Sequence, residues 1–441
     1  MGHSIDASSR RSPVPTWHLL LGWVILLPLL FFATNGKIIP DNGDVSMSMA
    51  EAGGSSMSHR LGLAFICLLC SVLIFTRLPA IFAISQRMKT ILALPILALI
   101  SSEWSESARQ SMVSGAILLV FTLFALYVAS SFDSKGQFEL LMLAGGVALV
   151  ISVGLSIFLP ALGAPGHNWR GIFAHKQNCA AVCTLLLVTA IHWRASGSNQ
   201  KLFRAMYAAM CCAMIVMSQS RTGWALAVLA LGLSGSLWLL QRMPGRDALF
   251  TSLCVIGIFG GIAYVVYSQA AVLLPAVGKD PTLSQRTVIW AAVWTTIAKQ
   301  PVLGYGYGAF WTGLQGPSLN IVLISGWALM QAQNGFLDLW LQVGIAGVIL
   351  ILLTTAQAAR DAIRCFRGSG EDHYVRWCIV VIITTLVYNV GESSLGMVQL
   401  VWFLFLLACI GLKQAAAAKH QDSRLNQHEG GLSLSHPVSV A

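Results

Sequence analysis

Two uncharged runs decide the fold: Met112–Phe132 (MVSGAILLVFTLFALYVASSF) and Leu140–Leu159 (LLMLAGGVALVISVGLSIFL). A helix needs about 20 mostly apolar residues to cross the hydrocarbon core of a bilayer, and both runs meet this length. Three further runs also lack a charged side chain: Thr222–Gln241, Ala248–Gly278 and Ser393–Leu412. The chain therefore contains several membrane-spanning segments.

The composition of the whole chain agrees with these runs. Of the 441 residues, 56% are hydrophobic and only 10% are charged, and the mean hydropathy is +0.72. A soluble protein carries about 25% charged residues. This composition excludes a soluble enzyme, a nucleic-acid-binding domain and a disordered protein. Because unpaired backbone groups are costly in lipid, the spanning segments are predicted to be helices.

We expect an all-α polytopic membrane protein with about twelve transmembrane helices. One connection is far longer than the rest, and long ordered connections are usually functional. Within it, Ser284–Lys299 is predicted to form a helix on the membrane surface. The expected organisation is a cytoplasmic tail (1–16), nine spans (17–269), the long outer loop (270–334), three spans (335–412) and a disordered cytoplasmic tail (413–441).

The net charge of +10 becomes informative when the cations are sorted by side. With the N-terminus placed in the cytoplasm, 18 of the 27 lysines and arginines fall on the cytoplasmic side and 9 on the outer side. This bias follows the positive-inside rule and places both termini in the cytoplasm. The outer cations are the ones that membrane insertion alone does not favour.

Arg221 is the most informative outer cation, because it sits in a very tight turn between two predicted spans. A guanidinium group offers a rigid fork of donors for phosphate oxygens. Arg170 and Arg286 follow the same logic, and His175 and Lys176 lie close to Arg170 in the sequence. Together they predict an outward-facing pocket for a phosphate or diphosphate. The alternative for each is a snorkelling anchor at the membrane boundary.

Aromatic side chains crowd the long loop, among them Tyr305 and Tyr307. An interfacial aromatic belt explains such a cluster, and stacking on sugar rings is the alternative. No phosphate-binding loop, dinucleotide fingerprint or zinc motif is present, and Cys67-x-x-Cys70 lacks a second ligand pair. We therefore predict neither a metal nor a cofactor.

Six segments carry a resemblance to a known family. They are Arg170-Gly-Ile-Phe-Ala-His175-Lys-Gln-Asn178, Ser218-Gln-Ser-Arg221-Thr-Gly223, Ser284-Gln-Arg286-Thr-Val-Ile-Trp290, Pro301-Val-Leu-Gly-Tyr-Gly-Tyr-Gly308, Asn334-Gly-Phe-Leu-Asp338 and Glu392-Ser-Ser-Leu395. In this order and spacing they resemble the O-antigen ligase and Wzy-type polysaccharide polymerase superfamily, and within it the exopolysaccharide polymerase branch.

The resemblance implies an enzyme at the periplasmic face of the bacterial inner membrane. It would polymerise undecaprenyl-diphosphate-linked oligosaccharide repeat units into an exopolysaccharide or O-antigen, without a metal or a nucleotide sugar. The implied partners are that lipid-linked oligosaccharide and membrane lipid, with chain-length regulator and export proteins as further partners. No nucleic acid is expected.

The resemblance also implies roles for residues. Those with an implied catalytic role are Arg221, Arg286, Glu392 and His175. Those with an implied role in substrate binding are Arg170, Lys176, Asn178, Gln333, Asn334, Asp338, Tyr305 and Tyr307. In many relatives a histidine proposed as the base stands where this chain has Gln333. Because glutamine does not accept a proton at neutral pH, the base would be Glu392 or His175, with Asp338 as a third candidate whose rival role is to orient its neighbours.

Two alternatives remain open at the level of sequence. A ligase that moves finished glycan to a lipid or protein acceptor would show the same donor-side motifs. A transporter or flippase of lipid-linked sugars would also suit about twelve spans, but carriers need two related halves and often intramembrane carboxylates. The predicted spans contain almost no Asp or Glu, and the long loop does not lie at the middle of the chain.

Overall fold

The structure is a computed structural model that describes residues 16–34, 57–243, 247, 250–251, 286–313, 315–326, 329–366 and 373–433. Every regular element within these ranges is a helix, which confirms the all-α prediction. Residues 1–15 of the predicted tail, most of the predicted span 248–269 and residues 270–285 of the predicted loop lie outside the described residues.

Seven helices within the described ranges are long and apolar enough to cross a membrane. They are α5 (Ala108–Ser131), α6 (Ser134–Phe158), α9 (Ser198–Met217), α10 (Arg221–Arg242), α15 (Gly335–Phe366), α16 (His373–Gly391) and the first part of α17 (Leu400–Ser433). The pair α2 (Met57–Phe75) and α3 (Leu78–Arg87) adds an eighth if it is counted as one broken span, because the two helices meet at 87°.

The expected number of about twelve spans is not confirmed. The helices α1 (Thr16–Ala33), α4 (Lys89–Ile100) and α8 (Lys176–His192) lie at three of the other predicted positions. Helix α4 has 12 residues and contains Pro95, so at about 1.5 Å per residue it is too short to cross a bilayer upright. Helix α8 has 17 residues and lies inside the bundle, with nearly all of its side chains buried.

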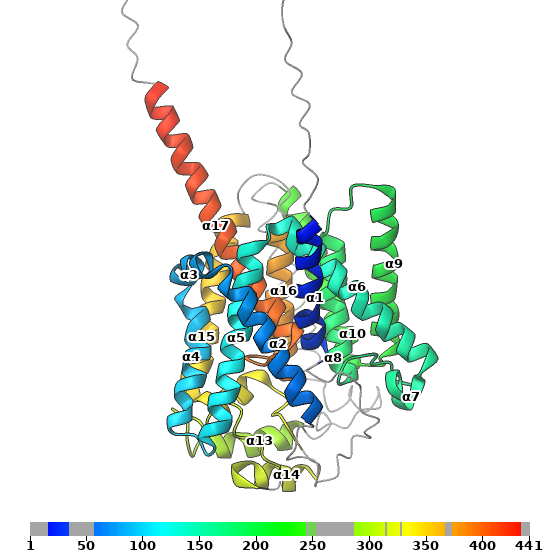
Figure 1. Cartoon of the computed structure of the whole chain (residues 1–441), viewed down its shortest axis with the longest axis vertical. Helices are drawn as coiled ribbons and strands as arrows, with labels where there is room; N and C mark the ends of the chain where they lie inside the picture. The colour runs from blue at the N-terminus through cyan, green and yellow to red at the C-terminus, as the bar shows by residue number, and fades with distance from the viewer. Residues whose placement is uncertain are drawn as a thin grey trace, which may run out of the picture.

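The centre of the bundle is packed from α5, α8, α16 and α17, with the remaining helices around them (Figure 1). Aromatic side chains fill much of this core. The ring of Phe121 in α5 lies 4.6 Å from that of Phe32 in α1 and 6.0 Å from that of Phe403 in α17. Edge-to-face contacts of this kind stabilise packing beyond the burial of apolar area.

The short helices α13 (Arg286–Ile297) and α14 (Leu319–Ser325) lie across one end of the bundle, at the bottom of Figure 1. We call this end the α13 end. The described part of the predicted outer loop folds there, and helix α7 (Pro160–Gly163) lies at the same end before α8 begins. The chain reverses direction before each of α8, α10 and α15, so these three helices begin at this end.

Local side-chain caps fix where two of these helices begin. The hydroxyl of Ser220 accepts a hydrogen bond from the backbone of Gly223 at 3.1 Å, which caps α10. The amide oxygen of Asn334 accepts from the backbone of Phe336 and Leu337 at 3.0 and 3.1 Å, which caps α15. These caps satisfy donors that the first turn of a helix leaves unpaired.

Helix α17 continues beyond residue 412, where we expected the last span to end and a disordered tail to start. The structure describes it as one helix to Ser433, and residues 434–441 lie outside the described part. The run Ala415–Ala418 has high helix propensity. The ammonium group of Lys413 also lies 3.5 Å from the carboxylate of Asp361 in α15, which ties this extension to the bundle.

Candidate functional site

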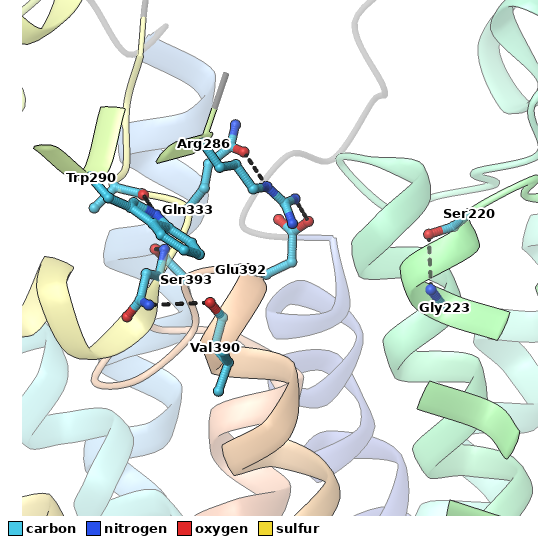
Figure 2. Close-up of polar contacts among 10 residues, drawn as sticks. Ser220, Gly223, Arg286, Trp290, Gln333, Val390, Glu392 and Ser393 are labelled. Carbon is cyan, nitrogen blue, oxygen red and sulfur yellow. Dashed lines mark hydrogen bonds and ion pairs between the residues drawn. The ribbon is translucent and has the colours of Figure 1, made fainter. Parts of the chain in front are cut away.

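Three segments far apart in the sequence bring Arg286, Gln333 and Glu392 together at the α13 end. Arg286 Nη2 donates to Oε1 of Glu392 at 2.6 Å, and Arg286 Nε donates to Oε1 of Gln333 at 2.9 Å. Figure 2 shows the three side chains pointing toward one another from α13, the turn before α15 and the end of α16. The side chains of Arg286 and Glu392 are 16% and 8% exposed, so the ion pair is shielded from water on most sides.

The backbone around this group is joined at several points. The backbone of Gly335 donates to the carbonyl of Glu392 at 3.0 Å, and that of Asn334 donates to the hydroxyl of Ser393 at 3.2 Å. The Asn334 side chain donates to the carbonyl of Val390 at 3.1 Å. These bonds fix the start of α15 against the end of α16 (Figure 2).

Gln333 itself has a positive φ of 51°, which is uncommon for a residue other than glycine. The indole of Trp290 in α13 donates to the neighbouring Ala332 carbonyl at 3.1 Å and holds this turn. The geometry therefore aims the Gln333 amide at Arg286. The Gln333 amide oxygen, which accepts from Arg286, helps to orient the guanidinium group.

Charge pairing changes the role that Arg286 can have. We predicted a cationic clamp for a diphosphate, yet the positive charge of Arg286 faces a carboxylate. A carboxylate held by a charge-assisted hydrogen bond is well positioned but remains an acceptor. The arrangement can therefore position Glu392 to accept a proton from a hydroxyl group.

Asp338 lies in the first turn of α15, where its backbone donates to the carbonyl of Asn334 at 2.9 Å. Its side chain is 1% exposed, and its Oδ1 accepts from the indole of Trp311 at 2.7 Å. Its Oδ2 has no hydrogen-bond partner among the described residues. A buried carboxylate so placed fits the positioning role considered above, since its contacts join the α13–α14 region to α15.

A second group of predicted residues gathers where α8 and α10 begin. At Gly223 a Cβ atom would lie 2.2 Å from that of Ala180, so only glycine allows the first turns of α10 and α8 to approach this closely. The backbone of Trp169 donates to the carbonyl of Met217 at 3.0 Å, which holds the segment before α8 beside the end of α9.

The polar side chains of this second group differ in how they are held. Arg221 and His175 are exposed, whereas Asn178 is buried. Lys176 donates to the side chain of Asn168 at 3.4 Å. Arg170 donates to the carbonyls of Leu162 and Ala174, each at 3.3 Å, so its guanidinium group supports the fold of its own loop.

The start of α10 and the start of α8 are suited to an anion. Helix N-termini present backbone N–H groups and a partial positive charge, and both termini here carry a cation, Arg221 and Lys176. The two groups lie at the same end of the bundle, and α10 packs against both α8 and α16 (Figures 1 and 2). The structure thus brings two helix N-termini that carry cations and a carboxylate–guanidinium group to one end.

Tyr305 and Tyr307, predicted to bind substrate, are buried, with 5% and 7% of their surface exposed. The hydroxyl of Tyr305 donates to the carbonyl of Thr296 at 3.0 Å, and that of Tyr307 donates to the carbonyl of Gly396. Burial raises the pKa of both phenols. In this structure the two side chains hold the loop onto the bundle.

The same loop rests against the start of α5. Gly306 has a φ of 99°, and a Cβ atom there would lie 2.1 Å from the hydroxyl oxygen of Ser105. The next residue, Tyr307, donates from its backbone to the hydroxyl of Ser101 at 2.9 Å. The glycines in this run thus allow the close approach that seats the loop.

Sequence reasoning missed Asn389. This fully buried side chain in α16 accepts from the backbone of Ser394 and Leu395 at 2.7 and 2.9 Å and shapes the turn that carries Glu392. The available signal was an amide residue inside an otherwise apolar span, since polar groups in spans are costly and are often functional. Trp311, the partner of Asp338, had no such signal.

No group of three or more His, Cys, Asp or Glu side chains suited to a metal occurs among the described residues.

The fold and this site are those of a polytopic membrane protein with a polar site at one end of its helix bundle. Residues 206–352 match the O-antigen ligase family, a range that includes Arg221, Arg286, Gln333 and Asp338. The two other segments of this chain that bear predicted residues, Arg170–Asn178 and Glu392–Leu395, lie outside it.

A particular relative is the exopolysaccharide production protein ExoQ of Rhizobium meliloti (strain 1021). It is 25% identical over 285 residues, which cover 61% of this chain and 63% of the relative. The matched part thus spans less than two thirds of that protein. Together the two matches confirm the similarity to the O-antigen ligase and Wzy-type superfamily that the motifs predicted.

Proposed function

We propose that this protein is a glycosyltransferase that polymerises lipid-diphosphate-linked oligosaccharide repeat units at the α13 end. One observation carries the proposal: Arg286 contacts both Gln333 and Glu392 at the same end of the bundle as the cationic N-termini of α8 and α10. The donor we propose is undecaprenyl diphosphate carrying the glycan, in the bacterial inner membrane. The bias of Lys and Arg supports cytoplasmic termini, which makes the α13 end periplasmic.

The first step is binding of the diphosphate of the donor. Arg221 and Lys176 receive its oxygens, with the backbone N–H groups at the starts of α10 and α8 adding further donors. As the glycan leaves the lipid, negative charge grows on the phosphate oxygen that bridges it to the sugar. Fixed cations in a partly water-excluded site stabilise that charge more in the transition state than in the ground state.

The second step is attack by an acceptor hydroxyl on the anomeric carbon. A bond forms between the acceptor oxygen and that carbon, and the bond from the carbon to the phosphate oxygen breaks. Glu392 receives the proton of the hydroxyl, while Arg286 and Gln333 hold the carboxylate in place. Because the attack is a direct displacement, the anomeric centre inverts. Lipid diphosphate is a good leaving group, so positioning supplies much of the catalysis.

Polymerase activity is favoured over ligase activity by one observation. The curated relative is described as an exopolysaccharide production protein. The ligase remains a second candidate because the matched family is described as O-antigen ligase. The two activities share the donor and differ in the acceptor.

A deletion strain separates the two activities. Loss of a polymerase leaves lipid-linked single repeat units, whereas loss of a ligase leaves long lipid-linked polymer. We expect single repeats, resolved by size after extraction of the lipid-linked material, and restored polymer when the wild-type chain is supplied. Long lipid-linked polymer in the deletion strain would overturn the polymerase assignment in favour of the ligase.

A further inference from the structure

A cavity of about 360 Å³ opens at the α13 end, away from Arg286. This volume falls in the range of pockets that bind small molecules. Its wall is formed by the end of α13, the turn that follows it and the start of α14. The lining residues include Thr296, Lys299, Gln300, Tyr305, Pro317 and Asn320.

The cavity offers hydrogen-bonding groups that the fold does not use. The side chains of Lys299, Gln300 and Asn320 are exposed, and the described residues provide no side-chain hydrogen bond or ion pair to any of them. An ammonium group and two carboxamides supply several donors and two acceptors. Tyr305 and Pro317 add apolar surface beside them. Hydroxyl-rich ligands with apolar ring faces, such as sugars, match this combination.

Helix α13 relates the cavity to the site. Arg286 is its first residue, and the cavity lies at its other end, beside Thr296 and Lys299. With 12 residues at about 1.5 Å each, the helix separates the two places by about 18 Å. That separation corresponds to a short oligosaccharide. A glycan whose reacting end lies beside Glu392 can therefore reach the cavity with sugars several rings away from that end.

We propose that this cavity, lined by Lys299, Gln300 and Asn320, is a subsite that binds the glycan several sugars away from its reacting end. The inference rests on the proposed function. The subsite strengthens the binding of any glycan long enough to span this separation, and it takes no part in the bond-forming step.

The test uses the full-length protein purified in detergent and supplied with undecaprenyl-diphosphate-linked single repeat units. The variant Lys299→Met with Asn320→Ala removes two of the three groups, and Asn320→Trp fills the cavity without removing Lys299. The matched control is Lys201→Met with Asn199→Ala, which changes exposed side chains between α8 and α10 at the start of α9. Initial formation of lipid-linked dimer and the length distribution of the final polymer are both measured.

We expect both cavity variants to need about tenfold more repeat unit for half-maximal dimer formation and to yield shorter polymer, since loss of two hydrogen bonds weakens binding about tenfold. At saturating repeat unit they should form dimer at the wild-type rate. The control variant should match wild type in both measurements. Unchanged dimer formation and polymer length in both cavity variants would overturn the subsite, as would a loss of dimer formation that saturating repeat unit does not restore. If wild type itself formed no dimer, the proposed function would fail, which is a separate outcome.

Discussion

The two polar groups at the α13 end are built in opposite ways. Around Glu392 each side chain is held by the fold: Arg286 contacts Glu392 and Gln333, and the backbone of Gly335 bonds to that of Glu392. Around Arg221 the key cation is exposed at the start of a helix. We infer that the first group is preorganised for proton transfer, whereas the second is completed by the diphosphate of its substrate.

The largest expected effect tests the preorganised group. Glu392→Gln keeps the shape of the side chain and removes the proton acceptor, so the rate of transfer should fall about 10²–10⁴-fold. The rate is measured with purified protein and lipid-linked repeats. Glu139→Gln, an exposed carboxylate near the start of α6, is the matched control and should be neutral. A near-normal rate for Glu392→Gln would assign the base to another residue, with His175 the next candidate.

The next effect tests the exposed group. Arg221→Ala removes one donor to the developing charge on the leaving diphosphate, which should reduce the rate about 10²–10³-fold. Insertion and folding should be unchanged because Arg221 is exposed. Arg87→Ala, which removes an exposed arginine at the end of α3, serves as the control. If Arg221→Ala polymerised as fast as this control, the diphosphate would have to bind elsewhere.

A smaller effect sharpens the contrast between the two arginines. Arg286→Lys keeps the charge beside Glu392 but cannot reproduce the fork that also contacts Gln333. Loss of one charge-assisted hydrogen bond should lower the rate about tenfold, with little change in the affinity for the donor. Kinetics at varied donor concentration would separate the two quantities. A change confined to donor affinity would show that Arg286 binds the diphosphate, as the sequence first predicted.

The smallest effect concerns the loop that seats the site. Tyr307→Phe removes the hydroxyl that donates to the Gly396 carbonyl, and a typical net hydrogen bond contributes about 1 kcal/mol to stability. Thermal unfolding in detergent should therefore show a modest decrease in melting temperature, and the rate of glycan transfer should change little. A strong loss of activity with unchanged stability would instead indicate that Tyr307 contacts the substrate.

The sequence predicted the features that depend on composition and local pattern. Long uncharged runs such as Leu140–Leu159 predicted helices of the observed kind, and α6 covers that run up to Phe158. It could not predict contacts between distant segments. Arg286 and Glu392 are 106 residues apart, and nothing in either motif shows that their charges meet. The burial of Tyr307 and the bend between α2 and α3 likewise depend on tertiary packing.

The most direct test of the central claim is to count lipid diphosphate released against glycosidic bonds formed by the purified protein. Undecaprenyl-diphosphate-linked single repeats are the only substrate, and no membrane is present. We predict one undecaprenyl diphosphate released for each bond formed, inversion at the anomeric carbon, and loss of both products in Glu392→Gln and Arg221→Ala. Release without bond formation, or no reaction in wild type, would contradict the claim that the α13 end is a glycan-transferring site.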